Sequence, residues 1–155
     1  GGNLPASVEL FGEAIGLTVC YDMRFPELYQ ALSQTCTLII NIANWPDKRR
    51  DHWQTLLKAR SIECQSFIAG CNRCGSGNGL NYSGDSAVYS PWGEEAAKAE
   101  PYKEQLIYAE INGKVCREAR EIFPVKQDRK LELYRDFYAC ALQGRCRGAR
   151  RTSRG

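Results

Sequence analysis

The pattern of apolar and polar positions predicts strands and helices in alternation along the first half of the chain. Short apolar runs with β-branched side chains are typical of strands covered on both faces, and apolar side chains at helical spacing indicate amphipathic helices. Pro26 suits the first position of a helix. We therefore expect strands over residues 14–20, 36–43 and 66–72, and helices over residues 25–33 and 51–65.

The second half of the chain predicts a hairpin followed by a helix. Residues 86–90 and 105–111 have strand character, and Pro91 and Gly93 mark a turn in the segment between them. Residues 73–85 are rich in glycine and are expected to form a loop rather than regular structure. The last expected helix covers residues 113–123 and ends before Pro124. The element order predicts an α/β fold with a later antiparallel hairpin.

Composition is that of a folded domain. The chain has 155 residues, of which 43% are hydrophobic and 25% charged, and a complete domain of this length buries roughly 70% of its unfolded surface. The net charge of +3 is too small to indicate a nucleic-acid ligand, and we expect none. No apolar run reaches the roughly 18 residues of a membrane span, so we expect no membrane partner.

The end of the chain is basic. Residues 144–155 contain five arginines and no acidic residue. A basic terminus can bind RNA or anionic lipid, but a disordered, solvated terminus explains the same composition, and we favour that interpretation. We expect a disordered tail over residues 135–155.

Eight cysteines raise the question of disulfides or zinc. A disulfide framework suits small secreted chains better than this one. Cys64, Cys71 and Cys74 include one CxxC pair, but a structural zinc site normally needs four ligands and no second pair is present. We therefore expect reduced thiols in a cytoplasmic protein, with no metal and no cofactor.

Cys20 is the candidate nucleophile, because it ends a predicted strand and precedes a turn and a helix. A thiol needs a partner that lowers its pKa or accepts its proton. His52, the only histidine, allows a Cys–His pair, while a lysine or a carboxylate could act instead. The residues alone do not choose among these partners, nor do they exclude a cysteine that only packs.

Several motifs resemble the nitrilase superfamily, the carbon–nitrogen hydrolases. They are GLTVCYDMRFPEL, NIANWPDKRRDHWQTLLKARSIECQSFIAGCNRCG, GDSAVYSPWGE and EAREIFPVKQDRKLELY, and they follow one another in the family's order. The resemblance implies a four-layer α-β-β-α sandwich that assembles as a homodimer. It implies a Glu–Lys–Cys catalytic set that hydrolyses amides through a thioester. The ω-amidase branch, which acts on 2-oxo acids such as 2-oxoglutaramate, is the most similar.

The same resemblance implies roles for individual residues. Cys20 matches the nucleophile, and the backbone N–H of Tyr21 matches an oxyanion donor. Arg24 matches a position that contacts a substrate carboxylate in carbamoylase relatives, although an ion pair with Asp22 or Glu27 is equally open at this point. Asn44 and Trp45 match the loop that lines the family's pocket.

The sequence departs from the family in length. The family's catalytic glutamate and lysine lie upstream of the nucleophile, whereas only 19 residues precede Cys20 and none of them is a lysine. We therefore expect residues 1–134 to be the C-terminal part of a hydrolase domain, and the chain alone to be inactive. An N-carbamoyl amide hydrolase and a non-catalytic fragment with a basic nucleic-acid-binding tail are the alternatives.

Overall fold

The fold was analysed in a computed structural model that describes residues 2 and 4–142. The chain divides into two compact units, Gly1–Phe123 and Pro124–Gly155, and each is described by itself. The first unit carries all the strands described and the candidate site. The described part of the second unit consists of residues 124–142 and contains helix α4 (Leu131–Leu142).

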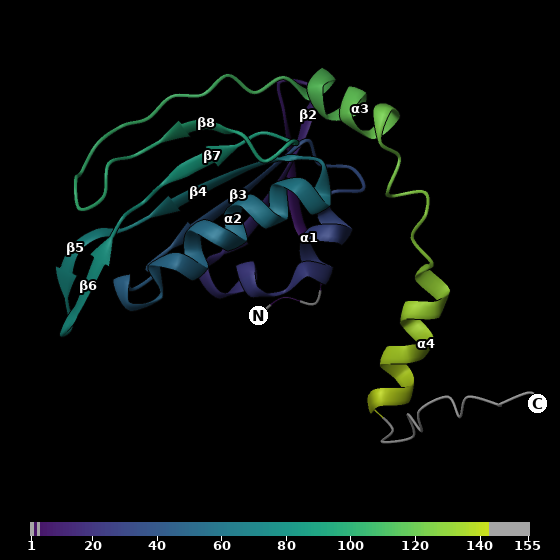
Figure 1. Cartoon of the computed structure of the whole chain (residues 1–155), viewed down its shortest axis with the longest axis horizontal. Helices are drawn as coiled ribbons and strands as arrows, with labels where there is room; N and C mark the ends of the chain where they lie inside the picture. The colour runs from purple at the N-terminus through teal and green to yellow at the C-terminus, as the bar shows by residue number, and fades with distance from the viewer. Residues whose placement is uncertain (1, 3, 143–155) are drawn as a thin grey trace, which may run out of the picture. The chain divides into compact units, whose positions relative to one another are not determined.

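A six-stranded sheet forms the centre of the first unit (Figure 1). Strands β2, β3 and β4 are parallel, and the outer strands pair in antiparallel fashion. The order is β1-β2-β3-β4-β7-β8, with β1 (Ala6–Leu10), β2 (Glu13–Val19), β3 (Leu38–Ala43), β4 (Phe67–Asn72), β7 (Ala87–Tyr89) and β8 (Glu95–Lys98). The three parallel strands are those predicted from the apolar runs, so the α/β class is confirmed.

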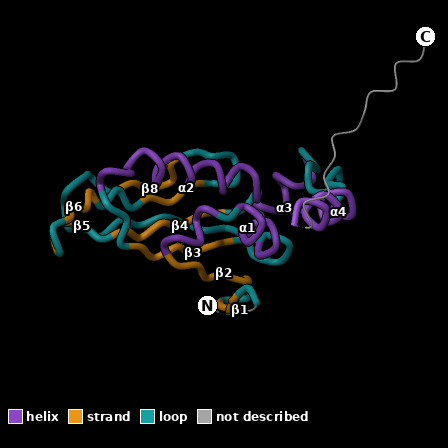
Figure 2. The backbone as a smooth tube through the Cα atoms, turned by 90° about the horizontal axis from the view of Figure 1, so that it is seen from below, coloured by secondary structure: helices purple, strands orange, loops and turns teal. Residues whose placement is uncertain are grey.

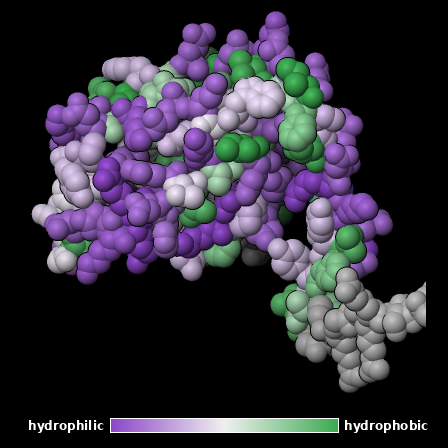
Figure 3. Space-filling view, viewed as in Figure 1, coloured by the Kyte–Doolittle hydropathy of each residue, from purple (hydrophilic) through white to green (hydrophobic). Residues whose placement is uncertain are grey.

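Two helices cover one face of this sheet, α1 (Pro26–Leu32) and α2 (Arg50–Cys64) (Figure 2). Trp53 and Leu57 of α2 are fully buried against the sheet. Their close approach requires Gly70 in β4, because a Cβ there would lie 2.6–2.7 Å from atoms of both side chains. Figure 3 shows mainly hydrophilic side chains on the outer surface of this helical layer.

The opposite face of the sheet remains apolar and open among the described residues. Gly16 and Thr18 point toward the helices, and the alternate positions Leu17 and Val19 are 42% and 57% exposed. Ile42, paired with Val19 in the next strand, is 54% exposed. The described residues thus supply one helical layer and one sheet layer of the four that the family resemblance implies.

The glycine-rich segment is not a loop, contrary to prediction. It forms a hairpin of β5 (Cys74–Gly77) and β6 (Leu80–Ser83). Its two-residue turn is Asn78–Gly79, and both residues have positive φ, 54° and 72°. Asn-Gly is a strong signal for this turn type, because these residues tolerate positive φ at low cost.

The strand predicted over residues 105–111 is also wrong. That segment is extended but unpaired, with Leu106 and Tyr108 80% and 83% exposed. A strand needs a neighbour for its backbone groups, and β8 pairs with β7 instead. The turn at Pro91 and Gly93 is confirmed, with Gly93 at φ 78°.

The last predicted helix is confirmed as α3 (Gly113–Ile122). The sequence predicted a disordered tail from residue 135, but α4 makes residues 135–142 helical. The rest of that tail, residues 143–155, lies outside the described residues. No helix in the described part of the chain is long and apolar enough to span a membrane.

Candidate active site

The candidate site lies where the three parallel strands end. Cys20 directly follows β2, and Asn44 and Trp45 directly follow β3. Asn72 is the last residue of β4 and pairs in register with Ala43. Because parallel strands end at the same edge of a sheet, residues distant in sequence meet there, and ligands of α/β proteins bind at such edges.

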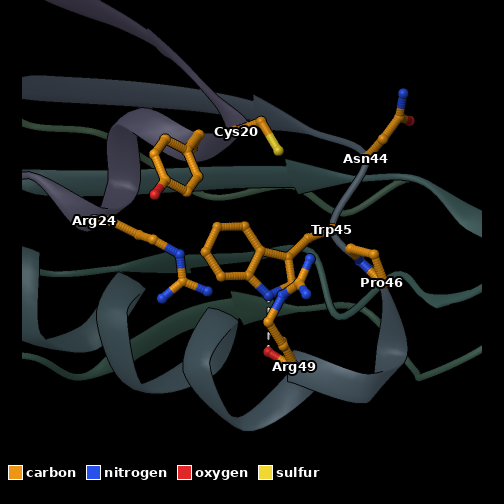
Figure 4. Close-up of a pocket in the computed structure, with 7 residues that line it drawn as sticks. Cys20, Arg24, Asn44, Trp45, Pro46 and Arg49 are labelled. Carbon is orange, nitrogen blue, oxygen red and sulfur yellow. Dashed lines mark hydrogen bonds between the residues drawn. The ribbon is translucent and has the colours of Figure 1, made fainter.

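Cys20 has an unusual backbone conformation. Its φ is 45°, in the left-handed region that a residue other than glycine adopts at a cost of about 1–3 kcal/mol. It begins a short 3₁₀ helix, η1 (Cys20–Arg24), and Asp22 fixes the turn by accepting a hydrogen bond from the N–H of Val19 at 2.9 Å. The thiol is half-buried and its sulfur points to the side where Trp45 lies (Figure 4). Such strain is typical of functional positions.

The backbone N–H of Tyr21 lies at the start of η1. The first N–H groups of a helix have no acceptor within the helix. The N–H of Tyr21, a residue that lines the same pocket as Cys20, is therefore a candidate oxyanion donor, and this role stays a prediction.

Arg24 leaves η1 toward Trp45. Its guanidinium carbon lies 4.6 Å from the centre of the indole ring, a cation–π geometry, and one guanidinium nitrogen lies 3.3 Å from Nδ1 of His52. His52 thus contacts Arg24 rather than the thiol, and the Cys20–His52 pair allowed by the sequence is not formed.

Trp45 is buried and is held by its neighbours on three sides. Asn72 accepts a hydrogen bond from the N–H of Trp45 at 2.7 Å and donates to its carbonyl oxygen at 3.2 Å. The indole N–H donates to the carbonyl oxygen of Arg49 at 2.7 Å. Asn72 also donates to the carbonyl oxygen of Gly84 at 2.8 Å. These hydrogen bonds fix the position of the Trp45 ring against which Arg24 lies.

These residues surround a pocket of about 280 Å³. All five residues singled out from the sequence line it, together with two that sequence reasoning missed: Cys20, Tyr21, Arg24, Asn44, Trp45, Pro46 and Arg49. The missed pair lies in the motif NWPDKRRDHW, which already carried Asn44 and Trp45. Within the described residues, no group of three or more His, Cys, Asp or Glu side chains could hold a metal ion.

An ion pair between the partly exposed Arg50 and the buried Asp85 anchors the beginning of α2 beside the pocket. Asp85, 1% exposed, accepts two hydrogen bonds of 2.7 Å from Arg50 and one of 2.9 Å from Gln54. Burial alone raises the pKa of Asp85, but the hydrogen bonds and the charge of Arg50 outweigh it. The pKa of Asp85 therefore lies below its ordinary value.

A half-buried cysteine on a strained turn, a nearby guanidinium and parallel strand ends are features of a cysteine-dependent hydrolase site. The chain matches the family model of carbon–nitrogen hydrolases over residues 2–121. It therefore belongs to the carbon–nitrogen hydrolase family.

Within this family, the chain is similar to two proteins that are named as amidases. The chain is 48% identical to the omega-amidase YafV of Escherichia coli strain K12 over 128 residues, which cover 82% of this chain and 50% of that protein. It is 38% identical to a 2-oxoglutaramate amidase of Bacillus subtilis over 134 residues, 86% of this chain and 51% of that protein.

A solved structure supports the fold. A superfamily member from Xanthomonas campestris, which carries an arsenic adduct in its active site, superimposes with a TM-score of 0.76. It is 36% identical, and the match covers 83% of this chain and 51% of that one. The chain spans about half the length of the curated relatives it matches.

Proposed function

We propose that this chain contributes the nucleophile and part of the substrate pocket of an amidase that hydrolyses the ω-amide of a small 2-oxo acid. The observation that carries the proposal is the pocket at the strand ends, where Cys20 and Arg24 face the same space. A thiol next to a fixed cation suits an amide substrate that also bears a carboxylate. The names of the two relatives, an omega-amidase and a 2-oxoglutaramate amidase, agree with this choice.

The proposed reaction has two steps. The Cys20 sulfur attacks the amide carbon, the N–H of Tyr21 binds the oxyanion, and the carbon–nitrogen bond breaks as ammonia leaves with a proton. Water then attacks the thioester carbon, and the carbon–sulfur bond breaks to give the dicarboxylic 2-oxo acid and the free thiol. Arg24 holds the distal carboxylate, and Asn44 and Trp45 form the pocket wall.

The proton transfers in both steps need acid–base groups, which we assign to residues outside this chain. Family resemblance implies a glutamate and a lysine for this purpose, and neither is matched in this sequence. A positioned acid–base group contributes about 10²–10⁴ in rate. We therefore expect the chain alone to be inactive and the open sheet face to be covered when the domain is complete. Assembly as a homodimer and a cytoplasmic location are further parts of the proposal.

The test joins the chain behind the first half of the E. coli omega-amidase and measures ammonia released from 2-oxoglutaramate. We expect turnover by the joined protein, none after Cys20→Ala, and none by the chain alone. Circular dichroism checks that the Cys20→Ala protein is folded. Turnover by the chain alone near that of a complete homologue would refute the need for outside residues. Carbon dioxide released from ureido substrates would identify an N-carbamoyl hydrolase instead.

A further inference from the structure

Two arginines, not one, line the pocket. Arg24 extends from η1, after β2, and Arg49 extends from the 3₁₀ helix η2 (Asp47–Arg49), after β3. Figure 4 shows their side chains on different sides of Trp45, with Arg49 on the side of Pro46. The pocket that Cys20 lines is therefore bordered by two arginines, which belong to the segments that follow β2 and β3.

Arg49 and its neighbour Arg50 differ in whether an acidic side chain neutralises their charge. Arg50 is neutralised by the buried carboxylate of Asp85, with two hydrogen bonds of 2.7 Å. Arg49 forms no ion pair among the described residues, and its backbone oxygen, not its guanidinium, accepts the indole N–H of Trp45. The backbone of Arg49 is fixed while its charge remains available to the pocket.

Like charges around one pocket repel each other, and an anionic ligand relieves that repulsion. Arginine suits the purpose, because its planar fork matches a carboxylate and stays charged at all relevant pH values. Arg24 is already stacked on the Trp45 ring, so little side-chain entropy is lost when it binds. The guanidinium of Arg49, which has no ion-pair partner among the described residues, is then the second group that binds the ligand carboxylate.

We infer that Arg49 is a specificity-determining residue, which together with Arg24 favours small ligands that carry a carboxylate over uncharged ligands in the pocket that Cys20 lines. The inference rests on the proposed function only in taking Cys20 as the reacting group. It goes beyond that function because it assigns anion selection to a residue that the family resemblance did not single out.

Alkylation of Cys20 tests the inference on the chain itself, without turnover. Iodoacetate and iodoacetamide transfer nearly the same group to a thiolate: a carbon–sulfur bond forms, the carbon–iodine bond breaks and iodide leaves. Only iodoacetate carries a carboxylate. The rate ratio of the two reagents at Cys20, measured by peptide mass spectrometry, therefore reports anion selection. The exposed Cys71 in the same sample is the internal reference.

We expect a higher iodoacetate-to-iodoacetamide ratio at Cys20 than at Cys71, and a fall of about fivefold after Arg49→Gln, the size expected for one lost charge at pocket distance. Lys48→Gln is the matched control, because it removes the same charge from an adjacent exposed residue that does not line the pocket. Arg49→Lys should keep most of the ratio. The preference should also weaken in high salt.

Two results would overturn the inference, and they are distinguishable. Equal ratios in Arg49→Gln and Lys48→Gln proteins would remove Arg49 from anion selection and leave the thioester chemistry intact. A Cys20 that neither reagent alkylates, in a chain with native circular dichroism, would contradict both the inference and the proposed function. The exposed side chain of Arg49 makes unfolding of its variants an unexpected outcome, and the same spectra check it.

Discussion

We expect the hydrogen bonds of Asn72 to be the main interactions that hold Trp45 in place. Asn72→Ala removes three hydrogen bonds, two to the backbone of Trp45 and one to Gly84. Asn72 is buried, with 8% of the residue exposed, so water cannot easily replace these hydrogen bonds. At about 1 kcal/mol for each net hydrogen bond, the substitution should cost about 3 kcal/mol of unfolding free energy.

Urea unfolding followed by circular dichroism measures this cost. We expect a lower midpoint with an unchanged slope, because the surface exposed on unfolding stays the same. Asn44→Ala is the control. Asn44 is exposed and lies in the loop that carries Trp45, and its side chain has no hydrogen bond among the described residues. The effect of this substitution on the unfolding free energy should therefore stay within about 0.5 kcal/mol. A cost below about 1 kcal/mol for Asn72→Ala, or equal costs for both variants, would refute the argument.

Three further predictions concern other parts of the fold. Asp85→Asn should cost about 2 kcal/mol, less than a fully buried pair because Arg50 is partly exposed. Since the folded-state pKa of Asp85 is lowered, its contribution is present above the unfolded pKa of about 3.9 and is lost as pH falls further; midpoints measured against pH should show this loss in the wild type but not in the variant. Gly70→Ala should cost about 1–3 kcal/mol in the same urea assay, since its Cβ would overlap Leu57 and Trp53, and an unchanged midpoint would contradict that packing. Leu17→Thr with Ile42→Thr should lower the fluorescence of a hydrophobic dye bound to the chain; unchanged fluorescence would mean that the open sheet face does not bind the dye.

Local patterns predicted the centre of the fold well. The apolar runs located β2, β3 and β4, and parallel strands bring their ends together, so Cys20 and Trp45 could be expected in one place. The segment 105–111 shows the limit of such patterns. Its strand character is real, but pairing depends on a neighbour that the described residues do not offer.

The sequence also did not indicate which of the two adjacent arginines, Arg49 or Arg50, keeps its charge available to the pocket. Arg49 and Arg50 are chemically identical, and which one keeps an available charge is decided by Asp85, 35 residues beyond Arg50. The hairpin of β5 and β6 is a different case. The Asn78–Gly79 dipeptide in the sequence favours its turn, but the glycine-rich composition around it favoured the prediction of a loop. Roles for the individual site residues remain predictions.

The central claim is that Cys20 carries the acyl group during amide hydrolysis. The most direct measurement is peptide mass spectrometry of the joined protein, quenched in acid during turnover of 2-oxoglutaramate. We predict the acyl group on the peptide containing Cys20, as a thioester that hydroxylamine removes. An acyl group on another residue, or full turnover by the Cys20→Ala protein, would contradict the account.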